Sequence, residues 1–157
     1  MKVMLLQLGK TNENYLKQGL SDYHARIKKL MSFEVKTLAE SRSGQKTPVS
    51  VIRKEEAKRI VAACNKGDFI ILLDEEGESM GSRDFAAFLQ KTMNTGPKRI
   101  VFIIGGPMGL HPELKGGAQK VLSLSAMTFS HQLVRLLFAE QLYRALTILR
   151  GIPYHND

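Results

Sequence analysis

The chain has 157 residues, enough for one hydrophobic core and too few for two substantial ones, which excludes multidomain architectures. With 43% hydrophobic and 24% charged residues, the composition is globular and excludes collagen-like, low-complexity and disordered chains. The formal net charge of +8, concentrated in residues 1–60 with 13 basic and 6 acidic side chains, favours a polyanionic partner. We expect residues 1–157 to form a single domain.

The sequence carries no pattern typical of a disulfide, a metal site or a membrane segment. Its one cysteine, Cys64, cannot form an intramolecular disulfide and has no cysteine or histidine near it at metal-ligand spacing. The first apolar run ends at Gly9, too soon for a secretory signal, and no stretch approaches the roughly 18 apolar residues of a membrane span. We expect a soluble cytoplasmic protein that contacts no membrane.

In the first part of the chain, hydrophobic spacing predicts alternating strands and helices. Residues 3–8 form a short apolar run typical of a strand, and residues 12–30 place apolar side chains at helical spacing. Residues 33–37 alternate apolar and polar side chains, as a half-buried strand does. A polar loop is expected over 40–50, followed by a helix over 50–64.

The second part contains two continuous apolar runs, 69–73 and 100–104, which are rich in β-branched residues and typical of central parallel strands covered on both faces. Further helices are expected at 82–94, 112–119 and 131–149, and a further strand is expected at 121–125. This order predicts an α/β domain with a mostly parallel sheet and helices on both faces.

The final helix, 131–149, is apolar around most of its circumference. Such a helix must be covered on most sides. A second copy of the chain is a natural cover, which favours a homodimer; the alternative is that the helix is buried within its own domain.

Three segments directly follow predicted strands, where open α/β sheets place their ligands. The first, Gly105 to Gly109, departs from the glycine patterns of dinucleotide and nucleoside-triphosphate sites, so it indicates either a small ligand held by backbone groups or a turn that needs positive φ. The second, Leu73 to Gly77, is expected to be an acidic turn, which indicates solvated surface more than a metal site. The third, Leu122 to His131, is rich in hydroxyl groups. We expect one pocket among them.

His131 begins the final helix, where it is either a base or phosphate ligand, or a structural hydrogen-bonding residue. The terminal Ile152-Pro153-Tyr154-His155 is unusual for a disordered tail and is expected to fold over a pocket, its own or a partner's. No Ser-His-Asp or Cys-His triad is recognisable by motif.

The combination of these motifs resembles the RlmH family of ribosomal RNA large-subunit methyltransferases over essentially the whole chain. The matching segments are Gly9-Lys10, Leu73-Asp74, IIGGPMGL, LSLSAMTFSHQLVR, EQLYRA and the terminal PYH. The resemblance implies the SPOUT class, with a C-terminal trefoil knot, S-adenosylmethionine bound in the knot without a metal, and a homodimer. It also implies methylation of N3 of a pseudouridine in 23S ribosomal RNA within the assembled ribosome.

The resemblance also implies the residues that bind the cofactor, which are Leu73, Gly105, Leu124, Ser125, Ala126, Met127, Thr128 and Phe129. For orienting the base and stabilising charge, the candidates are Arg144, Tyr154 and His155, supported by His131. Ser130 departs from the family pattern, which commonly has proline before this histidine. Two alternatives remain open: a non-catalytic RNA-binding module of the same fold, and an enzyme acting on a small phosphorylated metabolite.

Overall fold

The computed structural model describes residues 1–41 and 46–157, so part of the predicted loop over 40–50 lies outside the described residues. Ten elements of the predicted kinds follow in the predicted order. They are β1 (Lys2–Leu8), α1 (Asn14–Leu30), β2 (Ser32–Leu38), α2 (Val49–Ala63), β3 (Asp68–Ser79), α3 (Ser82–Asn94), β4 (Arg99–Ile104), α4 (Leu114–Gly117), β5 (Lys120–Ser123) and α5 (Leu133–Arg150).

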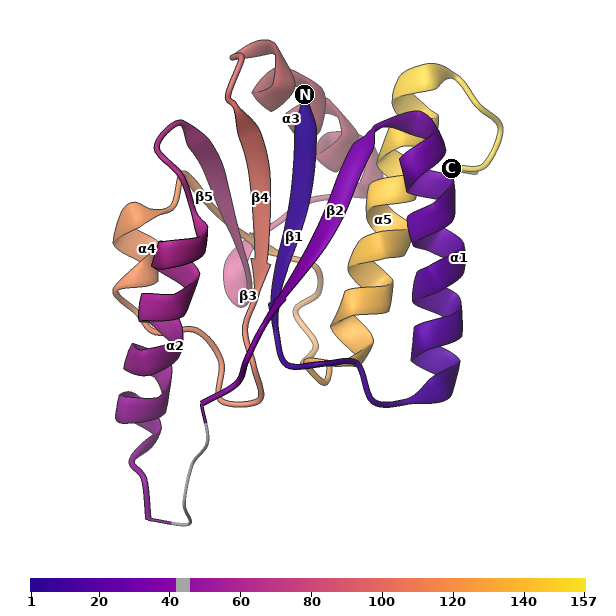
Figure 1. The fold of residues 1–157 in the computed structure, drawn as a ribbon. Helices are drawn as coiled ribbons and strands as arrows, with labels where there is room; N and C mark the ends of the chain where they lie inside the picture. Colours follow the sequence, from indigo (N-terminus) through magenta and orange to yellow (C-terminus); the bar gives the residue numbers. More distant parts are fainter. Residues whose placement is uncertain (42–45) are drawn as a thin grey trace.

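The five strands are all parallel and lie in the order β2-β1-β4-β3-β5 (Figure 1). Connections running toward the β2 edge use α1 and α3 on one face, and those running toward the β5 edge use α2 and α4 on the other. A connection that runs toward one edge on one face has the same hand as a connection that runs toward the other edge on the opposite face. Every crossover in this sheet therefore has the same hand, as right-handed βαβ units require. The predicted α/β class, parallel sheet and two helical faces are confirmed.

Each face of the sheet buries its own core because successive strand side chains point to opposite sides. Val3 and Leu5 of β1 pack with α1, α3 and α5, whereas Met4 and Leu6 pack with α2 and α4. On the first face the rings of Phe102 and Phe138 have centroids 4.7 Å apart, which joins the central strand β4 to α5.

Helix α5 lies beside α1 and contacts α3 as well (Figure 1). Every residue of α5 except Arg150 is buried or half-buried. Its own domain therefore covers most of its apolar circumference. The homodimer stays a prediction, and the apolar surface of this helix does not by itself support it.

Strand β3 is longer than predicted. Residues 74–77, which the sequence indicates as a turn, form an excursion within the strand: Leu73 and Glu78 both lie opposite Leu122 of β5, and pairing resumes at Ser79. Among the described residues no group of three His, Cys, Asp or Glu side chains is arranged to hold a metal ion.

None of the helices in the described part of the chain combines the length and the apolar character that a membrane crossing needs.

A buried ion pair joins the amino ends of the central strands. Arg99 donates to both carboxylate oxygens of Asp68, over 2.6 and 2.9 Å, and Asp68 also accepts the backbone N–H of Asn65. The Asp68 side chain is 0% exposed and that of Arg99 is 17% exposed. The hydrogen bond from Arg99 lowers the pKa of Asp68.

We predict that Asp68→Ala lowers the free energy of unfolding by about 3 kcal/mol at neutral pH, because it leaves a partly buried guanidinium without its partner. Because the folded-state pKa of Asp68 is lowered, the stabilisation is complete above the ordinary aspartate pKa and is lost as pH falls toward the lowered value. Denaturant titration at several pH values measures both the loss of unfolding free energy and its dependence on pH. The control is Glu34→Ala, which removes the exposed ion pair with Lys2 and should lower the free energy of unfolding by less than about 1 kcal/mol. Equal losses in the two variants would contradict a stabilising role of the buried pair.

Candidate functional site

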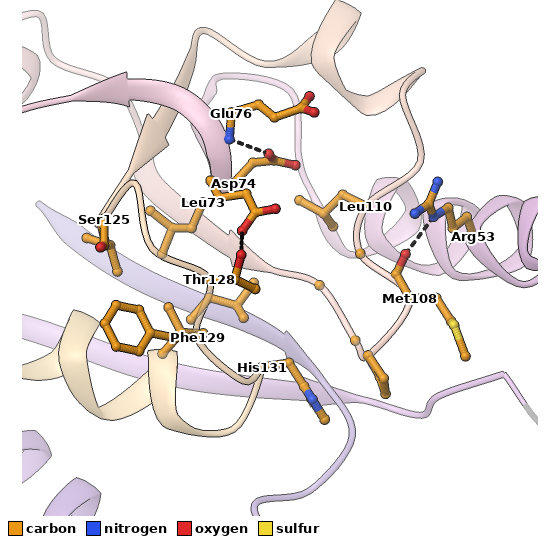
Figure 2. A pocket seen from close by; sticks show the side chains of 18 of the residues that line it. Arg53, Leu73, Asp74, Glu76, Met108, Leu110, Ser125, Thr128, Phe129 and His131 are labelled. Carbon is orange, nitrogen blue, oxygen red and sulfur yellow. Dashed lines mark hydrogen bonds between the residues drawn. The ribbon is translucent and has the colours of Figure 1, made fainter.

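A pocket of about 450 Å³ lies where β3, β4 and β5 end and α5 begins (Figure 2). Its volume falls within the range of small-molecule sites, roughly 300 to 1,000 Å³. The pocket is lined by the acidic excursion of β3, the glycine loop 105–109 after β4, and the segment 124–131 before α5. The three segments that the sequence places after strands therefore do meet.

Seven of the eight predicted cofactor residues line this pocket: Leu73, Gly105, Leu124, Ser125, Met127, Thr128 and Phe129. Ala126 is exposed and is not among the lining residues. His131, one of the four catalytic candidates, also lines it. The chemistry of these residues toward a ligand stays a prediction.

The glycine loop depends on close backbone approach at one residue and on positive φ at another. A Cβ at Gly105 would lie 3.0 Å from Leu110 Cγ and 3.1 Å from the carbonyl carbon of Gly109. Gly109 has φ +78°, and its N–H donates to the Gly106 carbonyl over 3.0 Å. The turn that needs positive φ is therefore confirmed at Gly109, whereas binding of a small ligand by the backbone of this loop stays a prediction.

Helix α2 supplies two contacts to this loop that sequence reasoning missed. The Nε of Arg53 donates to the Met108 carbonyl over 2.6 Å, and Arg53 lines the pocket (Figure 2). Glu56 is 3% exposed, and its carboxylate lies near Gly106 with its pKa raised by burial. Both appear in the sequence only as charges within a helix. Because the contact spans 55 positions, no local pattern signals it.

Hydroxyl groups shape the segment between β5 and α5. Ser125 Oγ accepts the backbone N–H of Met127 over 2.9 Å, and Thr128 Oγ1 donates to Glu75 of the β3 excursion over 2.6 Å. Ser130 Oγ accepts the backbone N–H of Leu133 over 3.1 Å, which satisfies one free donor at the start of α5. Ser130 therefore holds the start of α5 through this hydrogen bond, at the position where the family pattern has proline.

The start of α5 also fixes the loop after β1. Arg135, 0% exposed, donates to the Leu8 carbonyl over 2.6 Å and to Thr11 Oγ1 over 3.0 Å. Gln132 bonds to the same loop through the Lys10 carbonyl and the Asn12 N–H. Beside them, burial and the positive charge of Arg135 lower the pKa of His131, so its imidazole is mostly neutral at pH 7.

The other three catalytic candidates form a separate cluster. Arg144 pairs with Glu140 over 2.5 Å, its Nη1 lies 3.1 Å from His155 Nδ1, and Tyr154 donates to Glu140 over 3.0 Å. The tail lies against α1 through Tyr23 and against α3 through Arg83. Burial raises the pKa of Tyr154, so this residue is a hydrogen-bond donor at neutral pH.

This tail cluster, Glu140, Arg144, Tyr154 and His155, is remote from the pocket of its own chain. Arg144 stands eleven residues after Leu133, or roughly 16 Å along the helix axis at about 1.5 Å per residue. The C-terminus lies toward the amino ends of the strands, whereas the pocket lies at their carboxyl ends (Figure 1). Within one chain, the tail does not cover the pocket.

Comparisons with known proteins identify the family of the chain. The family model described as "Predicted SPOUT methyltransferase" matches residues 1–155. A relative from Porphyromonas gingivalis, named Ribosomal RNA large subunit methyltransferase H, is 43% identical over 157 residues, covering 100% of both chains. One of the same name from Bacteroides thetaiotaomicron is 41% identical with the same coverage.

A solved structure of a methylase-family protein from Neisseria gonorrhoeae covers 98% of this chain and 95% of its own, with a TM-score of 0.42 and 10% identity, which is too distant to carry an argument. The family match and the full-length relatives decide the assignment: the chain belongs to the SPOUT methyltransferase family.

Proposed function

We propose that this protein is an S-adenosylmethionine-dependent methyltransferase acting on N3 of a pseudouridine in 23S ribosomal RNA within the assembled ribosome. The names of the full-length relatives support the ribosomal RNA substrate. The observation that carries the proposal is the pocket, in which seven residues implied by the sequence resemblance come together from three strand ends. A cytoplasmic location and the trefoil knot belong to the same proposal.

The lining of the pocket suits S-adenosylmethionine. Leu73, Ile104, Leu110 and Leu124 offer an apolar wall for the adenine, while Gly105, Gly106 and Gly109 line the pocket without side chains. The carboxylates of the β3 excursion suit ribose hydroxyls and positive charge. When bound, the cofactor supplies a methyl group on a sulfonium, an electrophile that needs no metal.

The protein must also hold an unstacked base and assist removal of the N3 proton. Among the predicted catalytic residues, only His131 lines the pocket of its own chain. Neutral at pH 7, its imidazole is able to accept a proton there. Arg144, Tyr154 and His155 offer a cation, a donor and a further imidazole, but the latter two cluster around Arg144, which lies roughly 16 Å along the helix axis from the start of α5.

We therefore propose that a second copy of the chain brings its tail cluster to this pocket. The lip of the pocket supports this: residues 126–130 are all exposed, with Met127 76% and Phe129 39% exposed. Exposed apolar groups beside a ligand pocket are typical of an interaction surface. In the homodimer, Arg144 would stabilise negative charge on the base, and Tyr154 and His155 would orient it.

The positive charge of residues 1–60 lies on two faces of the molecule. Lys28 and Lys29 are on α1, whereas Lys58 and Arg59 are on α2, across the sheet. Of the two helices, α2 reaches the pocket, through Arg53. We propose that the basic face of α2 meets the ribosomal RNA beside the pocket, by phosphate contacts that add affinity without reading sequence.

Mass spectrometry of nucleosides from 23S ribosomal RNA tests the function. Deleting the gene should abolish one N3-methylated pseudouridine, and purified protein with S-adenosylmethionine should restore it on ribosomes from the deletion strain. Identical nucleoside profiles with and without the gene would overturn the proposed substrate.

We predict that Gly105→Ala weakens S-adenosylmethionine binding about tenfold or more, since the added Cβ cannot fit 3.0 Å from Leu110 and 3.1 Å from Gly109 unless the loop shifts. Gly105→Glu should abolish binding. Calorimetry gives the affinities, and Gly116→Ala is the matched control because a Cβ at Gly116 meets nothing within 4 Å. Unchanged affinity in both Gly105 variants would refute the pocket assignment.

We predict that His155→Ala lowers turnover far more than cofactor affinity, because His155 acts on the base from the partner chain. Co-expression of His155→Ala with Gly105→Glu tests the crossing: mixed dimers contain one intact pocket facing one intact tail, so about a quarter of wild-type activity should return in a symmetric dimer. No recovery in mixed dimers isolated by two affinity tags would contradict the action of the tail on the partner's pocket, and full activity of His155→Ala alone would place His155 outside catalysis.

A further inference from the structure

The pocket carries charges of opposite sign on different walls. Asp74, Glu75 and Glu76 of the β3 excursion line one part, and Arg53 of α2 lines another, beside Met108 (Figure 2). A neutral backbone cradle for a nucleoside does not require this separation. It does match a ligand that carries both an anionic and a cationic group.

Three lining side chains are able to carry positive charge: Arg53, Lys115 and His131. Lys115 is already paired, with its Nζ 3.2 Å from Glu76 Oε2. The lowered pKa of His131 leaves it mostly neutral at pH 7. Arg53 is therefore the cation best placed to meet an anion in this pocket.

The guanidinium of Arg53 is anchored but keeps unused donors. Its Nε donates to the Met108 carbonyl over 2.6 Å, and no ion pair within residues 1–41 and 46–157 includes it. Of the five N–H donors of an arginine, those on the two terminal nitrogens are suited to bind a carboxylate in a bidentate manner. One of them, Nη2, lies 3.7 Å from the position of a Cβ on Gly109, at the pocket loop.

We propose that Arg53 binds the carboxylate of the methionyl part of S-adenosylmethionine. The inference rests on the proposed function and adds the orientation of the ligand. The carboxylate is the only anionic group of that molecule, while its ammonium and sulfonium are cationic and suit the acidic wall. Through the Met108 carbonyl, the same arginine holds the glycine loop, so Arg53 couples recognition of the amino-acid end to the shape of the nucleoside cradle.

Calorimetry with two ligands separates the carboxylate contact from the loop contact. The ligands are S-adenosylmethionine and its decarboxylated analogue, which keeps the adenosine and sulfonium and lacks only the carboxylate. The variant is Arg53→Gln, whose amide N–H is able to replace the bond to Met108. Lys115→Gln is the matched control, since it removes a lining cation that is already paired.

Arg53→Gln should weaken S-adenosylmethionine binding by about tenfold or more, the worth of a charge-assisted hydrogen bond, and leave the analogue within about twofold of wild type. Lys115→Gln should leave the ratio of the two affinities unchanged. Equal weakening of both ligands would overturn the proposal and assign Arg53 to the loop alone. Unchanged affinities with weaker methylation of ribosomes would overturn it in favour of an RNA contact.

The proposed function fails in a different way. If the wild-type chain binds neither ligand, the pocket is not a site for S-adenosylmethionine, and the role of Arg53 falls with it. Binding by the wild type together with no preference for the carboxylated ligand rejects the role of Arg53 only.

Discussion

The position of β4 between β1 and β3 is the constraint on which the site depends. All five strands are parallel, so their carboxyl ends share one edge, and the order β2-β1-β4-β3-β5 makes the ends of β4, β3 and β5 neighbours. Gly105 and Leu124 directly follow β4 and β5, and Leu73 lies in β3 opposite Ile104, the last residue of β4, so the three residues lie in one pocket. A strand order that did not keep β4, β3 and β5 adjacent would separate these segments, which are far apart in the sequence.

Contacts between distant parts of the chain then hold the edge in shape. Arg53 reaches the glycine loop from α2, and the buried Arg135 fastens the start of α5 to the end of β1. Neither arginine belongs to the backbone cradle itself. They fix the loops around it, so that the chain has little freedom to lose when a ligand binds.

Local patterns predicted the elements well because the spacing of apolar residues in each strand or helix follows from which of its faces are buried. The run at 100–104 is apolar throughout since β4 is covered on both faces, and the apolar circumference of the last helix reflects its place between α1 and α3. The same helix suggested a partner chain, although its own domain explains most of that burial. The continuation of β3 beyond the predicted turn at 74–77 was missed because the pairing of Glu78 and Ser79 with β5 is set by a distant strand. The roles of Arg53 and Glu56 were missed for the same reason, and only the fold reveals that Arg144, Tyr154 and His155 lie away from their own pocket.

A crystal structure with S-adenosylhomocysteine is the most direct test that these strand ends form the cofactor site. The ligand should lie among Leu73, Gly105 and Leu124, with its carboxylate toward Arg53 and the tail of the partner chain at the mouth of the pocket. Ligand density elsewhere on the chain, or none at saturating ligand, would contradict the assignment of this pocket.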